Sequence, residues 1–242
     1  MKTIIVIPVR MASSRFPNKP MALIEGFPMI QRVWQQAISS KIGQVLVACC
    51  ESEIFDLITS LGGQAIMTKK NHASGTDRIF EALVNYNQSE HFDSIINLQG
   101  DMPLINPNDI QKVNIPLIQG YDIGTLVTNI SKEEEENINI TKAKIKWITK
   151  NKLGQAIDFY KYSKKEIKNV YQHVGIYSFR YEILKKFIGL KSSENEIKLK
   201  LEQWRALDSN MTIGASFVKD VPISVDTKED LIKVQNIIKD IS

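Results

Sequence analysis

The sequence has few cysteines, no long apolar run and little excess of either charge. Its two cysteines, Cys49 and Cys50, are adjacent, so they have the spacing of neither a metal site nor a disulfide framework. We expect both thiols to be buried. No stretch reaches the length of about eighteen apolar residues that a membrane span needs, and residues 1–9 lack the features of a signal peptide. These absences predict a cytoplasmic protein that does not enter a membrane.

Several function classes lose support for similar reasons. The net charge is +4 over 242 residues, which is too small to indicate nucleic-acid binding unless the charge gathers on one face. The motif G-x-x-x-x-G-K-[ST] is absent, and no G-x-G-x-x-G follows a predicted strand. The absence of these two motifs argues against a P-loop kinase and against a dinucleotide-dependent dehydrogenase.

The first half of the chain alternates between short β-branched runs and amphipathic segments. This alternation predicts a mostly parallel sheet with helices on both faces. In such a sheet, ligands bind at the carboxyl ends of the strands. The predicted strands cover residues 3–9, 44–49, 65–67 and 94–98, and the predicted helices cover residues 28–41, 51–61 and 76–86.

The second half has a different pattern. Residues 131–137 are acidic and predict an exposed loop or helix start, and residues 142–152 alternate lysines with apolar residues, as in a half-exposed antiparallel strand. Without a repeat or a clear linker, we expect one domain over residues 1–242, with an insertion at roughly 130–180 that covers substrate or forms a dimer contact. Further strands are predicted at 174–179 and 212–218, and further helices at 195–207 and 227–241.

A basic loop follows the first predicted strand. Arg10, Arg15 and Lys19 are three cations within ten residues, and Ser13 adds a hydroxyl group. Arginine offers paired donors to a phosphate, lysine offers a mobile charge, and serine and backbone N–H groups satisfy the remaining lone pairs. A solvated surface loop with incidental charges is the alternative. The position at the carboxyl end of a strand favours phosphate binding.

Two aspartates also follow predicted elements of the sheet. Asp101 comes after the strand at 94–98, across a glycine, and Asp226 directly precedes the last helix. Mg²⁺ binds carboxylates and substrate phosphates together, so this pair is a candidate metal site. The alternatives are an ordinary turn residue at 101 and a residue beside a helix cap at 226.

The segment HASGTDR at residues 72–78 forms a small-residue turn that enters a helix. A helix N-terminus can receive an anion or a ligand hydroxyl group. The alternative is an ordinary capped helix with a surface arginine.

Six segments together carry a resemblance to a known family. They are IPVRMASSRFPNKP, HASGTDR, NLQGDMP, QHVGIYSFR, LEQWR and SVDTKEDL, in this order along essentially the whole chain. The set resembles the 3-deoxy-manno-octulosonate cytidylyltransferases, or CMP-Kdo synthetases. This resemblance implies a Rossmann-like α/β nucleotidyltransferase fold, a small antiparallel insertion for dimerisation and the sugar pocket, and a homodimer. It also implies that CTP and the acid sugar Kdo give CMP-Kdo and pyrophosphate with Mg²⁺, for lipopolysaccharide biosynthesis.

The resemblance also assigns roles to individual residues. Arg15, Lys19 and Asp101 would be catalytic, and Asp101 and Asp226 would hold Mg²⁺. CTP would contact Arg10, Ser13, Arg15, Lys19, Ser74 and Arg78. The sugar would contact Gln99, His173, Tyr177, Glu202, Gln203 and Lys161.

Two positions depart from the family pattern. Met102 replaces a common acidic residue after Asp101, and Lys161 stands where an arginine is expected, within an altered and shortened segment at 154–168. Lysine cannot make the paired contact that arginine makes with a carboxylate. A cytidylyltransferase for a related acid sugar, such as an acylneuraminate or an amino-substituted octulosonate, therefore remains open.

Two rival classes depend on other features. A catalytically weak or silent homologue would be favoured by loss of Lys19, Asp101 or Asp226, and all three are retained. A nucleic-acid-binding module would rest on the lysines of residues 142–152. Their alternation with apolar residues favours a solvated strand face instead.

Overall fold

The structure is a computed structural model that describes residues 1–13, 15–86, 91–162 and 168–241. Contacts divide the chain into two compact units, one of Met1–Gln111 with Pro222–Ser242 and one of Lys112–Val221. Each unit is described by itself, and the expected single domain with an insertion at roughly 130–180 stays a prediction. No helix in the described part of the chain is long and apolar enough to cross a membrane.

The first unit is built on four parallel strands. They are β1 (Thr3–Pro8), β4 (Gln44–Cys49), β5 (Gln64–Met67) and β6 (Ser94–Asn97), in the order β5-β4-β1-β6. Every residue of β1 and β6 is buried, which explains their continuous apolar runs, since a parallel sheet is covered on both faces. The predicted strands are therefore confirmed to within one residue at each end. Cys49 and Cys50 are buried free thiols, as expected.

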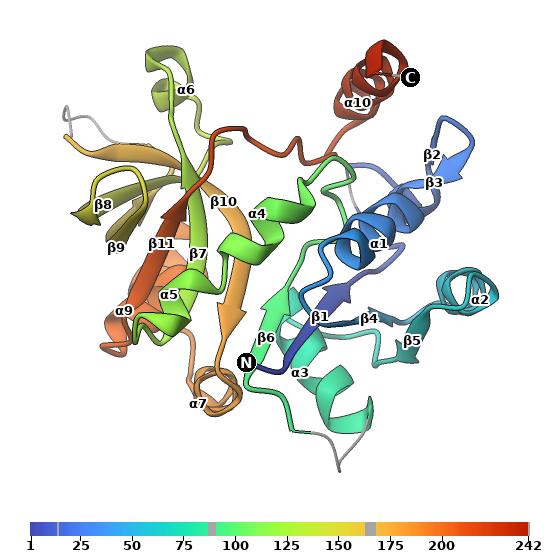
Figure 1. The fold of residues 1–242 in the computed structure, drawn as a ribbon, viewed down its shortest axis with the longest axis horizontal. Coiled ribbons are helices and arrows are strands. Elements are labelled where there is room, and N and C mark those ends of the chain that lie inside the picture. The colour runs from blue at the N-terminus through green and yellow to red at the C-terminus, as the bar shows by residue number, and fades with distance from the viewer. Residues whose placement is uncertain (14, 87–90, 163–167, 242) are drawn as a thin grey trace. The chain divides into compact units, whose positions relative to one another are not determined.

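Helices cover both faces of this sheet (Figure 1). They are α1 (Met29–Ser39), α2 (Ser52–Ser60) and α3 (Gly75–Tyr86), each of which connects two parallel strands, followed by α4 (Pro107–Lys112). The order of the strands reverses after β5, so α3 lies on the face opposite α1 and α2. Ligands bind where such a reversal occurs, at the carboxyl ends of the strands.

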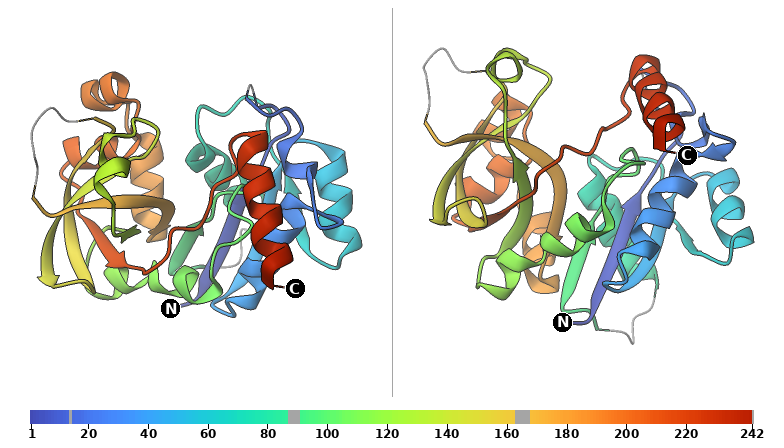
Figure 2. Two further views of the ribbon diagram at one scale, coloured as in Figure 1. Left: turned by 90° about the horizontal axis from the view of Figure 1, so that it is seen from above. Right: turned by 45° about the horizontal axis from the view of Figure 1, so that its top comes forward.

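The last helix, α10 (Lys228–Ile241), packs against the hairpin of β2 (Leu23–Ile24) and β3 (Phe27–Pro28) (Figure 2). Gln235 donates to the carbonyl of Leu23. The Thr227 hydroxyl accepts from the N–H of Asp230, and Asp230 accepts from the N–H of Thr227, so the two residues form a capping box with aspartate in place of glutamate. This cap fixes the start of α10, next to Asp226.

The second unit holds five strands whose pairings close into a ring. Their order is β10-β7-β11-β9-β8, and β10 also pairs with β8. Only β7 and β11 are parallel to each other, and the other pairs are antiparallel. The strands are β7 (Ile123–Thr128), β8 (Lys142–Thr149), β9 (Leu153–Tyr160), β10 (Val170–Phe179) and β11 (Ile213–Phe217), and the helices are α5 (Ile115–Ile118), α6 (Lys132–Glu136), α7 (Tyr181–Gly189), α8 (Glu194–Leu199) and α9 (Gln203–Asp208).

Two expectations for this unit were wrong in detail. The helix predicted at 195–207 is two helices, because Lys200 has a left-handed backbone (φ 55°) that ends α8. Residues 142–149 do form an antiparallel strand, and residues 150–152 are the turn that follows it, but the first lysine of the strand is not solvated. Lys142 is 0% exposed, and its ammonium donates to the carbonyl of Asn137 and, at 2.7 Å, to that of Lys161. These carbonyls replace the water that a buried ammonium loses.

Candidate active site

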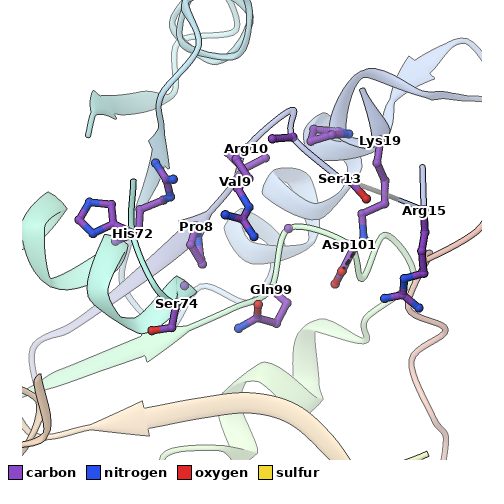
Figure 3. Close-up of a pocket in the computed structure, with 15 residues that line it drawn as sticks. Pro8, Val9, Arg10, Ser13, Arg15, Lys19, His72, Ser74, Gln99 and Asp101 are labelled. Atoms are coloured by element: carbon purple, nitrogen blue, oxygen red, sulfur yellow. Dashed lines mark hydrogen bonds and ion pairs between the residues drawn. The ribbon is translucent and has the colours of Figure 1, made fainter. Parts of the chain in front are cut away.

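A cleft of about 360 Å³ opens where β1 and β6 end in the first unit (Figure 3). It collects side chains from the loop after β1, the start of α3 and the turn after β6. Among its lining residues are Arg10, Ser13, Arg15, Lys19, Ser74, Arg78, Gln99 and Asp101. The structure thus brings together every residue of this unit that the sequence assigned to CTP, and Gln99 and Asp101 with them.

Apolar anchoring holds the basic loop after β1 in place. Phe16 is buried in a small core with Met29 of α1 and Val234 of α10, although its neighbours in the loop are polar. The N–H of Phe16 also reaches the hydroxyl of Ser13 at 3.4 Å. The anchor leaves Arg10 exposed at the cleft, with no ionic or hydrogen-bonding partner among the described residues. An uncommitted guanidinium of this kind is suited to a phosphate.

Lys19 joins the two aspartates that the sequence identified as candidate metal ligands. Its ammonium lies 2.8 Å from Oδ2 of Asp101 and 3.3 Å from Oδ1 of Asp226. Arg15 reaches the same Asp226 oxygen at 3.0 Å. The backbone also holds the two segments together, since the N–H of Val225 donates to the carbonyl of Asp101 at 2.9 Å. Residues 207 positions apart in the sequence therefore meet at one point.

The chemistry of this pair suits a divalent cation that arrives with phosphates. Both carboxylates already share one positive partner, and the Lys19 side chain is only 13% exposed. Mg²⁺ binds through one or two carboxylates and takes its other ligands from water and substrate. No cluster of three or more metal-ligating side chains occurs in the described part of the chain. The pair could therefore hold Mg²⁺ together with a nucleotide, and it is not a complete protein cage.

The loop before α3 is fixed by the helix that follows it. Ser74 caps α3, because its hydroxyl accepts from the N–H of Asp77 at 3.2 Å. Arg78 is buried, and its guanidinium donates to the Thr68 hydroxyl and to the carbonyls of Lys69 and Lys70. Arg78 borders the cleft, and its hydrogen bonds order residues 68–70. Its contact with CTP stays a prediction.

Gln99 is held by a short chain of hydrogen bonds. Its amide donates to Asn97 at 3.1 Å, and Asn97 donates to the Thr76 hydroxyl in α3 at 3.3 Å. Gly100 follows, and a Cβ added there would lie 3.2 Å from the carbonyl oxygen of Pro8. Glycine thus lets the turn pass close to the end of β1, where a side chain would require the backbone to shift by a few tenths of an ångström.

In the second unit, the structure brings together most of the residues assigned to the sugar. The Tyr177 hydroxyl accepts a hydrogen bond from the Gln203 amide. The rings of Tyr177 and His173 lie 5.5 Å apart, and His173 Nε2 is 3.0 Å from the Thr125 hydroxyl. A cavity of about 10 Å³, room for about one water molecule, is bordered by Tyr177, Glu202 and Gln203.

Burial sets the protonation of two of these groups. It lowers the pKa of His173 to about 3 and raises the pKa of Tyr177. Both side chains are therefore neutral around pH 7, and they can bind a sugar through neutral hydrogen bonds. The side-chain amide oxygen of Gln203, Oε1, is buried with no hydrogen-bond partner among the described residues, so one acceptor is left for a ligand hydroxyl group.

Lys161 stands apart from this group. It is exposed at the end of β9, where its carbonyl accepts from Lys142. In the described part of the chain, no contact joins its side chain to His173 or Tyr177. The altered segment at 154–168 is described only in part, because residues 163–167 lie outside the described residues. The roles of all these residues in binding stay predictions.

Sequence reasoning missed two residues beside the cleft. His72 lines the cleft, and its Nε2 is hydrogen-bonded to Glu81 of α3. His72 belongs to the HASGTDR segment, but only Ser74 and Arg78 of that segment were assigned roles. The signal for Glu81 was its position three residues after Arg78, which places both side chains on one face of the helix.

The strand order and the cleft define an α/β nucleotide-binding protein of the nucleotidyltransferase class. A solved nucleotidyl transferase from Methanothermobacter thermautotroptrophicus shares this fold, with a TM-score of 0.62 at 10% identity, over 100% of this chain and 99% of that one. A CMP:2-keto-3-deoxy-manno-octonic acid synthetase, solved in complex with CTP, has a TM-score of 0.91 at 32% identity, and each chain is covered completely.

Sequence comparison gives the family. The cytidylyltransferase family model matches residues 4–213. The 3-deoxy-manno-octulosonate cytidylyltransferase of Paramagnetospirillum magneticum is 41% identical over 98% of this chain and 97% of that protein. The enzyme of the same name from Brucella anthropi is 41% identical over 96% and 94%. The chain belongs to the cytidylyltransferase family, in the 3-deoxy-manno-octulosonate cytidylyltransferase group, as the resemblance predicted. It is a nucleotidyltransferase.

Proposed function

We propose that this protein transfers CMP from CTP to the anomeric hydroxyl group of Kdo, releasing pyrophosphate, and that the product serves lipopolysaccharide biosynthesis. The observation that carries the proposal is that Lys19, in a cleft also lined by Arg10, Arg15 and Asp101, contacts both Asp101 and Asp226. Three cations around two carboxylates suit a metal–triphosphate better than a neutral ligand. CTP and Kdo as substrates are supported by the names of the relatives, a 3-deoxy-manno-octulosonate cytidylyltransferase and a CMP:2-keto-3-deoxy-manno-octonic acid synthetase solved with CTP.

The reaction is an in-line displacement at the α-phosphorus. The sugar hydroxyl attacks, the bond to the β-phosphate breaks, and pyrophosphate leaves. Arg10, Arg15 and Lys19 neutralise the charge that develops on the phosphates, so the protein contributes mainly position and electrostatics. No enzyme-bound covalent intermediate is needed.

Asp101 and Asp226 would hold Mg²⁺ together with the phosphate oxygens. When bound, the ion supplies positive charge to the phosphates and lowers the pKa of the attacking hydroxyl group. Lys19 already occupies both carboxylates through its ammonium. We infer that the ammonium shifts toward the phosphates when the metal and nucleotide arrive.

The sugar residues would act by binding and orientation. With a pKa of about 3, His173 is too weak a base to remove the proton of the attacking hydroxyl group at neutral pH. The raised pKa of Tyr177 likewise keeps its phenol protonated. Neither residue is therefore proposed as the general base.

The test is a coupled assay of pyrophosphate release. The protein is incubated with CTP, Mg²⁺ and one of several 2-keto acid sugars, including Kdo, an amino-substituted octulosonate and an acylneuraminate. We expect release with Kdo and much less with the others. Release only with another sugar would reject Kdo, and no release with any sugar, despite CTP binding, would support a silent homologue.

The second candidate, a related acid sugar, is favoured by Lys161. We expect Lys161→Arg to lower the KM for the true sugar if this side chain meets its carboxylate, since arginine adds the paired contact. Lys150→Arg, at an exposed lysine of the β8–β9 turn, is the control. An unchanged KM in Lys161→Arg would remove Lys161 from the sugar site.

We further propose that the protein is a cytoplasmic homodimer that binds no nucleic acid. The family resemblance supports the dimer, and the mild charge of +4 argues against nucleic acid. Light scattering of the purified protein measures the assembly directly. A mass of one chain at micromolar concentration would reject the dimer.

A further inference from the structure

His72 lies at the end of the cleft opposite the triphosphate cations. Figure 3 shows His72 and Ser74 at one end, and Arg15, Lys19 and Asp101 at the other. If the phosphates lie against the cations, the nucleoside lies toward His72. No role was predicted for His72 from the sequence, and neither the phosphates nor the metal pair requires it.

The ring of His72 is held by a carboxylate from α3. Its Nε2 is hydrogen-bonded to Oε2 of Glu81, and the same oxygen accepts from the N–H of Lys69 at 3.0 Å. Burial by itself would raise the pKa of Glu81, but the hydrogen bonds from Lys69 and His72 bring it below its ordinary value. Glu81 is therefore ionised and can only accept, so Nε2 carries the proton.

The other ring nitrogen is left for a ligand. Nδ1 of His72 has no hydrogen-bond partner among the described residues, and His72 lines the cleft. With the proton fixed on Nε2, Nδ1 of the neutral ring is an acceptor. Carboxylate–histidine pairs of this kind fix the tautomer and the orientation of the ring.

We propose that His72 is a nucleoside-binding residue, whose Nδ1 accepts a hydrogen bond from a hydroxyl or amino group of the CTP nucleoside. Glu81 is the positioning residue that holds the ring in this orientation. Arg78, one turn away on α3, holds the same loop through the carbonyls of Lys69 and Lys70. One helix face thus orders the loop that carries His72. The inference rests on the proposed use of CTP.

Two substitutions of His72 separate ligand binding from a structural role. The amide oxygen of asparagine lies near the place of Nδ1, whereas the amide of glutamine reaches the place of Nε2 and can keep the contact with Glu81. Calorimetry gives the Kd of CTP with Mg²⁺ for each variant. We expect His72→Gln to weaken CTP by about tenfold and His72→Asn to weaken it less. The opposite order, or no change in either variant, would overturn the proposal.

Inorganic tripolyphosphate locates the effect within the cleft. It occupies only the phosphate end, so its affinity should be the same in the wild type and in His72→Gln. A second comparison uses UTP and 2′,3′-dideoxy-CTP, each of which lacks one kind of nucleoside donor. The penalty of His72→Gln should vanish with UTP if the donor is the cytosine amino group, and with the dideoxynucleotide if it is a ribose hydroxyl group. If His72→Gln also weakens the binding of tripolyphosphate, the assignment of His72 to the nucleoside is overturned.

Glu81 is tested through its dependence on His72. Glu81→Ala should weaken CTP several-fold in the wild-type background and add nothing to His72→Gln, because it acts through that ring. Asp56→Asn, at an exposed carboxylate of α2, is the matched control. Additive losses would overturn the positioning role. If the wild type binds no CTP, the proposed function fails. If it binds CTP and these variants do not change the affinity, only this inference fails.

Discussion

At the scale of a single residue, Lys19 has two roles. In the structure its ammonium neutralises two carboxylates, and in the proposed reaction it meets the phosphates. Both roles need a positive charge at the same place. A neutral side chain of similar length therefore removes the two roles together, and their consequences can be measured separately.

We expect Lys19→Met to lower turnover by on the order of 10²-fold or more, as the loss of a transition-state charge partner does. The measurement is steady-state pyrophosphate release, with KM for the sugar determined alongside kcat. Lys150→Met, at an exposed lysine, is the control and should leave turnover unchanged. A loss confined to the sugar KM would show that Lys19 does not act on the phosphates.

The same substitution should change metal binding in the absence of nucleotide. Without the ammonium, Asp101 and Asp226 repel each other, and a divalent cation relieves this repulsion. Titration of Mn²⁺, followed by electron paramagnetic resonance, should therefore show tighter binding to Lys19→Met than to the wild type. Equal affinities would indicate that Lys19 does not compete with the metal.

Asp101 and Asp226 should both be required for metal-dependent activity. We expect Asp101→Asn and Asp226→Asn each to abolish Mg²⁺-dependent pyrophosphate release, because asparagine keeps the shape but removes the charge that attracts the ion. Asp56→Asn on α2 is the matched control. Near-wild-type turnover in either variant would remove that residue from the metal site, whatever its distance from Lys19.

At the scale of elements, helices α8 and α9 depend on one buried ion pair. Arg205 donates from Nε and from a terminal nitrogen to the two oxygens of Glu196, at 2.9 and 2.5 Å. The guanidinium also lies 4.8 Å from the centre of the Phe187 ring. The contact fixes α9, which carries Gln203 to the Tyr177 hydroxyl. The contact also joins α9 to α8 across Lys200, where α8 ends.

We expect Glu196→Gln to destabilise the protein by about 2 kcal/mol at pH 7, because it removes the nearer counter-charge of a buried guanidinium and leaves only Glu202, at 3.7 Å. Burial alone would raise the pKa of Glu196, but Arg205 brings it below its ordinary value. The stabilisation is therefore complete above pH 4.5 and is lost as the pH falls through the lower folded-state pKa. Urea unfolding at several pH values checks this, with Glu194→Gln on the same helix as the control. A pH-independent difference between Glu196→Gln and the wild type would contradict it.

The elements that the sequence predicted best are those with a strong pattern. β1 and β4 are continuous apolar runs, and α1 has its apolar residues at helical spacing, so each was located closely. The break at Lys200 could not be predicted, since lysine is a good helix former, whereas the left-handed residue that ends a helix is usually glycine. The N–H groups of Lys200 and Leu201 both donate to the carbonyl of Glu196 there. Lys142 was misjudged for a related reason. Its acceptors are carbonyls of Asn137 and Lys161, which no local pattern reveals.

At the scale of the whole molecule, the site residues that could be predicted are those that lie close together in the sequence. The cations of residues 10–19 are contiguous, and the rule that ligands bind at strand ends placed them correctly. Asp101 and Asp226 were predicted only as two candidate metal ligands, without evidence from the sequence that they lie close together. Their contact depends on the backbone bond between Val225 and Asp101. Glu81 was missed because its role exists only through the fold of residues 68–72.

The stability of the whole chain depends on pH, and the buried side chain of His173 contributes to this dependence through the binding of one proton. Burial lowers the pKa of His173 from 6.5 to about 3, with the Thr125 hydroxyl on Nε2 and the edge of Phe159 against the ring. Between these two pH values the unfolded chain binds a proton that the folded chain does not. Stability therefore falls as the pH drops below 6.5, by up to about 1.4 kcal/mol per pH unit from this group alone.

We expect His173→Gln to remove that slope. Urea unfolding of the wild type and the variant between pH 7 and pH 4 gives two curves that converge as the pH falls, even if the variant is less stable at pH 7. Lys150→Gln, at an exposed lysine that does not titrate in this range, should run parallel to the wild type. If His173→Gln also runs parallel, the ring of His173 gains its proton in the folded protein as readily as in the unfolded chain. A charged imidazolium in the sugar pocket would then have to be considered for the reaction, because the argument against His173 as a titrating group depends on its burial.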